Sequence, residues 1–183
     1  LTYGYSYITL LGAVPRHKRS AGITAHRPRN ILEPYMSKAR YLHANSLLLL
    51  KELKDMAKEH QKCYYVPNGV DEELFHEVEP IKPEGRLIAG HVGKKCPAKG
   101  QKEFILPAIQ KAEVESMYNM NDYRSKKPWT EMYKLYQNMD VFVIASVEDG
   151  TPNGALEAAA CGRPIISNKI GNMPEFIIDG YNG

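Results

Sequence analysis

The sequence has little that would place it in a membrane. Apolar runs such as Leu47–Leu50 are far shorter than the roughly 20 residues that a membrane-spanning helix needs. The first residues also lack the pattern of a secretory signal. The sequence therefore contains no candidate membrane-spanning helix.

Cysteine and net charge are also scarce. The three cysteines, Cys63, Cys96 and Cys161, are widely spaced and odd in number. Neither they nor the six histidines show the spacing of metal ligands, so we expect no metal site. This cysteine usage favours a reduced, cytoplasmic compartment. The net charge of +3 is too small to indicate a nucleic-acid partner by itself.

What the sequence does contain is an alternation of predicted strands and helices after residue 44. Such alternation favours a parallel, doubly wound α/β sheet with right-handed crossovers, whose ligands bind outside the carboxyl ends of the strands. Before residue 45 only a short strand-like segment is predicted, at 22–25. The predicted strands are 63–66, 87–92, 114–118, 141–145 and 164–167, and the predicted helices are 46–60, 101–111, 130–139, a helix from 154, and 173–178.

The most informative stretch is 141–162, V-F-V-I-A-S-V-E-D-G-T-P-N-G-A-L-E-A-A-A-C-G. Its first five residues are apolar and mostly β-branched, as expected of a parallel strand covered on both faces. The chain then breaks at Gly150, Pro152 and Gly154, where Asn153 is a suitable N-cap for a helix. The free backbone N–H groups at this helix start predict an anion site.

Carboxylates flank this turn. Asp149 precedes it and Glu157 lies about one helical turn beyond it, so both carboxylates can point toward the predicted anion site. Acidic groups beside an anion site suit ribose or sugar hydroxyls better than phosphate, which suggests a sugar nucleotide. A plain strand–turn–helix with solvated carboxylates would show the same pattern.

Two lysines follow the predicted strand 87–92, in the segment G-K-K-C-P-A-K-G at 93–100. In an α/β sheet, Lys94 and Lys99 would lie at the carboxyl edge that also holds the turn after 141–145. Beside a helix N-terminus they would form a diphosphate clamp. Alone, they could be solvated surface lysines.

Four segments occur in a fixed order: A-N-S at 44–46, V-P-N-G-V-D at 66–71, the lysine segment at 93–100, and E-D-G-T-P-N-G-A-L-E-A-A-A-C-G-R-P-I-I at 148–166. Together they resemble the retaining glycosyltransferases of family 4, in the C-terminal nucleotide-sugar-binding domain of the GT-B fold. The trailing G-N-M-P-E at 171–175 is similar to the G-G-x-P-E segment of that family.

The resemblance implies a Rossmann-like, doubly wound parallel sheet that forms the C-terminal half of a GT-B glycosyltransferase. Residues 1–44 would be a remnant of the N-terminal acceptor domain with its linker. Residues 45–183 would be the donor-binding domain, truncated at its C-terminus. Because the chain begins at Leu1 without Met and ends in D-G-Y-N-G, we expect a fragment of a longer protein.

The resemblance also implies residue roles. Lys94 and Lys99 occupy the positions of an Arg and a Lys that hold the donor diphosphate, although Lys94 loses the bidentate geometry of Arg. Glu157 matches the acidic residue on the ribose, and Asp149 matches the one near the donor sugar, a role that the adjacent Glu148 could take if the turn shifts by one residue. The other donor contacts implied are Gly93, Gly150, Thr151, Pro152, Asn153, Gly154 and Ala155.

The implied reaction moves a sugar from a nucleoside diphosphate to an acceptor hydroxyl with retention at the anomeric carbon. Asp149, Lys94 and Lys99 would act at the reacting end, with no metal or cofactor. The base, the sugar and the acceptor, whether saccharide, lipid or another molecule, stay open. So do two alternatives, a non-catalytic nucleotide-sugar-binding module and a nucleotide-sugar epimerase.

The N-terminal part of the chain is basic. Its cluster could meet an anionic membrane surface or a lipid-phosphate acceptor, or it could be a solvated connector. His26 could face the acceptor or lie on the surface. We therefore expect a cytoplasmic protein that associates with membranes only if this cluster binds lipid. The cluster consists of Arg16, His17, Lys18, Arg19, Arg27 and Arg29.

Overall fold

The computed structural model describes residues 20–23, 29–77, 79, 87–93, 96–112, 115–120 and 128–183. The chain divides into two compact units. The first unit comprises residues 1–68 and 149–151, and the second comprises residues 69–148 and 152–183. Each unit is built around its own parallel sheet.

The first unit has a three-stranded sheet in the order β1-β2-β3. Ser46 caps its longer helix, because the Ser46 hydroxyl accepts a hydrogen bond from the Leu49 N–H at 3.2 Å. Leu42, Leu49 and Leu53 are fully buried between that helix and the sheet. The elements are β1 (Ser20–Ile23), α2 (Arg29–Met36), β2 (Tyr41–Ala44), α3 (Leu47–Met56) and β3 (Lys62–Tyr65).

The second unit has a four-stranded parallel sheet in the order β5-β4-β6-β7, which confirms the predicted Rossmann-like α/β fold. Its strands are β4 (Ile88–Gly93), β5 (Glu115–Met120), β6 (Val141–Ile144) and β7 (Ile165–Ser167). Its helices are α4 (Leu106–Ala112), α5 (Tyr133–Gln137), α6 (Asn153–Ala160) and α7 (Met173–Phe176). Shorter helical turns lie at Pro97–Lys99, Gln101–Ile105 and Trp129–Glu131.

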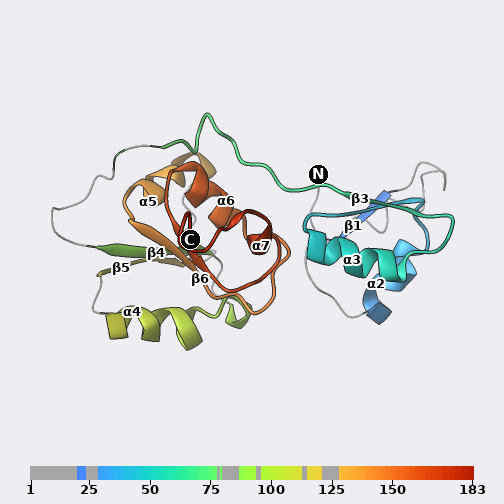
Figure 1. Cartoon of the computed structure of the whole chain (residues 1–183), viewed down its shortest axis with the longest axis horizontal. Coiled ribbons are helices and arrows are strands. Elements are labelled where there is room, and N and C mark those ends of the chain that lie inside the picture. The colour runs from blue at the N-terminus through green and yellow to red at the C-terminus, as the bar shows by residue number, and fades with distance from the viewer. Residues whose placement is uncertain are drawn as a thin grey trace. The chain divides into compact units, whose positions relative to one another are not determined.

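Both faces of the second sheet are covered. Phe142 and Ile144 of β6 belong to the core that α5 and α6 share, whereas Val143 packs against a second core that includes Ile109 of α4. Accordingly, α4 lies on one side of the sheet, and α5 and α6 lie on the other (Figure 1). This double cover explains why every residue of β6 is apolar.

The structure differs from the sequence-based expectation in several elements. The predicted helix 101–111 is a π-helical turn followed by α4, because the N–H groups of Phe104 and Ile105 both donate to the Gly100 carbonyl, at 2.9 and 3.2 Å. The predicted helix 130–139 is reduced to a 3₁₀ turn and α5. The helix α2 and the strand β2 were also not expected from the sequence.

The two units divide near residue 68, later than the division at 44/45 that the sequence suggested. The reason is strand pairing, because β2 and β3 extend the sheet that β1 begins. The roles of acceptor and donor domain remain predictions.

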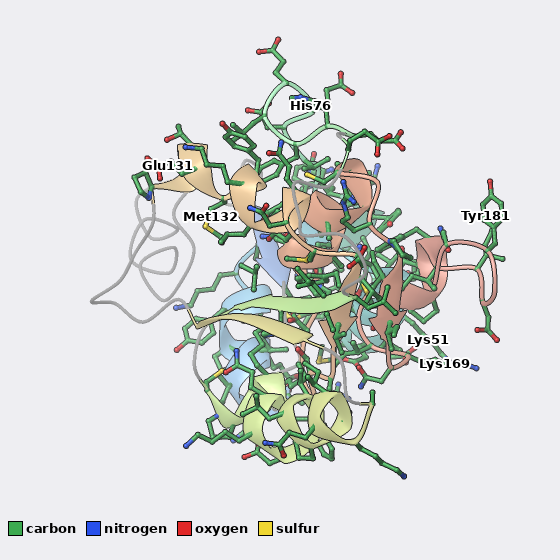
Figure 2. All side chains as sticks on the ribbon, turned by 90° about the vertical axis from the view of Figure 1, so that its left-hand side faces the viewer. Lys51, His76, Glu131, Met132, Lys169 and Tyr181 are labelled. Atoms are coloured by element: carbon green, nitrogen blue, oxygen red, sulfur yellow. The ribbon has the colours of Figure 1, made fainter. Side chains whose placement is uncertain are left out.

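The surface of the second unit includes isolated exposed hydrophobic side chains. Tyr181, near the end of the chain, is 84% exposed and points away from the ribbon (Figure 2). Among the helices that the structure describes, none combines the length and hydrophobicity needed to cross a membrane.

Candidate functional site

The loops that follow β4 and β6 lie side by side at the carboxyl edge of the second sheet. The two strands are hydrogen-bonded neighbours, with Ala89 opposite Val141 and Gly90 opposite Phe142. Beyond the strands, the Val147 N–H donates to the Ala98 carbonyl at 2.9 Å. The lysine segment and the turn after β6 are therefore joined by a backbone hydrogen bond.

Gly100 makes this close approach possible. Its backbone is left-handed, with φ of +60°, and a Cβ atom at this position would lie 2.2 Å from the Ala145 carbonyl oxygen. No side chain can be accommodated at that distance from a backbone atom, so only glycine fits between the two loops.

The first turn of α6 packs closely on the end of β4 and on the Phe142 ring of β6. A Cβ atom at Gly154 would lie 3.0 Å from Cζ of Phe142 and 3.3 Å from the Val92 carbonyl oxygen. The prediction that Asn153 caps this helix is wrong. Pro152, with extended backbone angles, is the cap residue, and Asn153 is the first helical residue.

Glu157 lies one turn into α6, as predicted, and is held by a residue of α5. The Tyr136 hydroxyl donates a 2.5 Å hydrogen bond to Oε2 of Glu157. Burial raises the pKa of the Glu157 carboxyl, and the hydrogen bond from Tyr136 opposes that rise by stabilising the ionised form. Burial and the neighbouring carboxylate raise the pKa of the Tyr136 phenol, which therefore stays a donor.

Lys99 ends the 3₁₀ turn after β4 and is partly buried. Burial, and to a smaller degree the positive charge of Lys99, lower the pKa of His91. Because His91 Nδ1 lies 2.8 Å from the Val143 carbonyl oxygen, Nδ1 is the protonated nitrogen. The His91 ring stacks on Phe142 with centroids 6.0 Å apart.

From the sequence, the histidines were considered only as possible metal ligands, and neither the packing of His91 nor the contact of Tyr136 with Glu157 was predicted. A histidine inside an otherwise apolar strand, three residues before a lysine, was the available signal for His91. For Tyr136 no short-range signal exists, because its partner Glu157 is 21 residues away.

The other predicted site residues are distributed as follows. Gly93 is the last residue of β4, and Ala155 is fully buried in α6. Asp149, Gly150 and Thr151 belong to the first unit by their contacts, and the Thr151 hydroxyl donates to the Asn45 carbonyl at 2.9 Å. Lys94 lies outside the described residues.

Some predictions concern residues outside the described part of the chain, including His26 and the basic cluster apart from Arg29. Arg29 lies 3.7 Å from Glu33, and both side chains are more than half exposed. Within the described ranges, no three His, Cys, Asp or Glu residues are grouped in a way that could hold a metal ion.

Sequence comparison identifies glycosyltransferases as relatives. Residues 99–183 match the family described as "Glycosyl transferases group 1". An uncharacterised glycosyltransferase of Methanocaldococcus jannaschii is 25% identical, over 79% of this chain and 46% of the relative. D-inositol 3-phosphate glycosyltransferase of Segniliparus rotundus is 27% identical, over 58% of this chain and 23% of the relative. The chain thus spans less than half the length of these two relatives.

Comparison with solved structures identifies the fold. Anabaena HepE, solved with UDP-glucose, matches 86% of this chain and 54% of its own with a TM-score of 0.62 and 16% identity. The pneumococcal O-GlcNAc transferase GtfA, solved with UDP and GlcNAc, matches 90% of this chain and 40% of its own with a TM-score of 0.60 and 14% identity. The described chain therefore has the fold of GT-B glycosyltransferases, and residues 99–183 match their group 1 family.

Proposed function

We propose that this protein contributes the donor site of a retaining glycosyltransferase, which moves a sugar from a nucleoside diphosphate to an acceptor hydroxyl. The observation that carries the proposal is Glu157, held by Tyr136 one turn into α6 at the carboxyl edge of a parallel sheet. A carboxylate there can accept hydrogen bonds from two ribose hydroxyls. The adjoining loop supplies Lys99 for the diphosphate.

The comparisons support a nucleotide-sugar donor. The group 1 match covers Lys99, α6 and Glu157. Two structural neighbours were solved with UDP and GlcNAc or with UDP-glucose. We therefore propose a UDP-sugar as the first donor to test, with GDP and ADP as competing nucleotides.

The demanding step in such a transfer is departure of the diphosphate, because negative charge builds on its oxygens. Lys94, Lys99 and the backbone N–H groups at the start of α6 would stabilise that charge electrostatically, so we propose that no metal is needed. The role of Asp149 near the donor sugar stays a prediction from the resemblance. Removing one such stabilising contact typically costs about 3 kcal/mol in the barrier.

Two alternatives use the same donor residues. A non-catalytic module would bind nucleoside diphosphates but give no turnover with any acceptor. An epimerase would convert the sugar of the donor without an acceptor, which product analysis of a UDP-sugar incubated alone would reveal.

The role of Glu157 gives the first test. We expect Glu157→Gln to keep the fold and to weaken UDP binding by about 1.5 to 3 kcal/mol, because a charge-assisted hydrogen bond to the ribose is lost. Isothermal titration calorimetry measures this difference directly. Glu131→Gln is the matched control, since Glu131 is exposed before α5 (Figure 2). Equal affinity of wild type and Glu157→Gln would refute the assignment.

A further inference from the structure

Tyr136 is one of the largest fully buried side chains of the chain. Its ring contacts Phe75 edge-on at 5.8 Å between centroids and Phe142 at 5.7 Å with the rings tilted. Two aromatic neighbours therefore fix the ring and aim its hydroxyl. That hydroxyl meets Oε2 of Glu157 at 2.5 Å.

We infer that Tyr136 is a positioning residue for nucleotide binding: its hydroxyl fixes one oxygen of the Glu157 carboxylate and leaves the other oxygen to accept from the ribose hydroxyls. This inference rests on the proposed function of Glu157. A carboxylate on a short, solvated side chain would sample several rotamers. Here the donor would meet a carboxylate whose orientation is already set, so less side-chain entropy is lost on binding.

The same hydrogen bond also controls the charge of Glu157. Burial favours the neutral carboxylic acid, which would be a poorer acceptor for ribose hydroxyls. The Tyr136 hydroxyl stabilises the ionised form and partly offsets burial. Without it, the pKa of Glu157 would rise further.

The ionisation of Glu157 makes donor binding depend on pH. Donor binding needs ionised Glu157, so affinity is retained above the pKa of this carboxyl and is lost as the pH falls through it. Because Tyr136→Phe raises that pKa, its affinity should begin to fall at a higher pH than in the wild type.

Other titratable groups lie on the elements packed around Glu157. Tyr133 and Lys134 are on α5, Cys161 follows α6, and His91 is on β4. Burial, and to a smaller degree the neighbouring Glu157, raise the pKa of Cys161 to about 11, so this thiol stays neutral in the acid range. His91 can titrate there because burial lowers its pKa. The Glu157→Gln variant, which lacks the Glu157 charge, therefore serves as the reference for any pH effect that comes from His91.

The experiment is a calorimetric titration of UDP across the acid and neutral range with the full chain and four variants. Tyr136→Phe keeps the ring and removes only the hydroxyl, and we expect its UDP affinity at neutral pH to fall about 5- to 10-fold. The loss of UDP affinity at acid pH should begin at a higher pH in this variant. The matched control Tyr133→Phe removes a hydroxyl from the same helix. It should leave both the UDP affinity at neutral pH and its loss at acid pH unchanged. Glu157→Gln alone and combined with Tyr136→Phe should bind UDP equally.

An independent readout is the Glu157 carboxyl resonance in the free protein, followed by NMR titration. We expect it to titrate at a higher pH in Tyr136→Phe than in the wild type. Two results would overturn the inference. One is that Tyr136→Phe binds UDP with the affinity of the wild type and loses that affinity at the same acid pH. The other is that adding Tyr136→Phe to Glu157→Gln weakens UDP binding further. Unchanged UDP affinity in Glu157→Gln would instead refute the proposed function, and the NMR titration would still report whether Tyr136 controls the carboxyl.

Discussion

Glu157 and Lys99 owe their proposed roles to their surroundings. Glu157 is partly buried and receives a hydrogen bond from Tyr136, whereas Lys99 ends a short turn whose backbone is bonded to the next loop. The carboxylate suits hydroxyl groups, and the ammonium suits phosphate. The two side chains should therefore contribute to different parts of one ligand.

This separation can be tested with Lys99. We expect Lys99→Ala to weaken UDP binding clearly while uridine binding stays unchanged, because the ammonium meets phosphate and neither the base nor the ribose. Raising the salt concentration should reduce the contribution of Lys99, since a partly exposed ion pair is screened. Calorimetric titrations with uridine and UDP measure both effects.

Lys102→Ala is the matched control, because Lys102 is exposed one turn beyond Lys99. An equal loss of uridine and UDP affinity in Lys99→Ala would show that the substitution disturbs the folded structure and does not remove a contact with phosphate. We predict the same selective loss for Lys94→Ala, from the role that the resemblance assigns to Lys94.

At the scale of elements, the site depends on how closely two loops approach. Gly100 places the turn after β4 against the Ala145 carbonyl, and Gly154 places α6 against the Val92 carbonyl of β4 and the Phe142 ring of β6. The two carbonyl oxygens are backbone atoms that cannot rotate away. Two features therefore position the loops: the glycines, which allow the backbones to approach closely, and the hydrogen bond from the Val147 N–H to the Ala98 carbonyl.

Gly100→Ala measures this contact. Its backbone has φ of +60°, so alanine pays about 1 kcal/mol for the left-handed conformation, and it also collides with the Ala145 carbonyl. Gly180→Ala is the matched control, since Gly180 has φ of +75° but a Cβ atom there meets nothing within 4 Å. We expect urea unfolding to show a loss of about 1 kcal/mol for Gly180→Ala and a distinctly larger loss for Gly100→Ala. Equal losses would mean that the two loops can separate at no cost.

At the scale of the whole molecule, the chain contains two units with separate sheets and spans less than half of the two full-length relatives compared above. Lys99, Tyr136 and Glu157 all belong to the second unit. These three residues, proposed for the ribose and the diphosphate, are thus in one compact body, whereas Asp149, Gly150 and Thr151 belong to the first unit by their contacts.

We expect the 183-residue chain to bind UDP but to transfer sugar very slowly or not at all. Transfer depends on holding donor and acceptor in register, and such positioning can supply about 7 to 11 kcal/mol of the barrier. Joining the chain to the amino-terminal part of a full-length relative should raise the transfer rate without tightening UDP binding much. Radiolabelled sugar transfer and calorimetry measure the two quantities separately. Robust acceptor glycosylation by the 183-residue chain alone would contradict this prediction.

The sequence by itself determined the class of fold and the order of most elements. The all-apolar strand β6, the Ser46 cap and the glycines around α6 are local signals, because periodicity, capping and chain breaks act over a few neighbouring residues. The same signals placed Glu157 one turn into a helix. They could not show that residues 41–65 extend the sheet of β1, because strand pairing joins segments distant in the chain.

Only the tertiary structure decided which side chains meet. Tyr136 reaches Glu157 across 21 residues, and His91 reaches the Val143 carbonyl across 52. Gly100 is required because the Ala145 carbonyl, in the loop after β6, approaches it closely. No local pattern encodes these contacts, since each depends on packing that arises when the strands align and the helices cover both faces of the sheet.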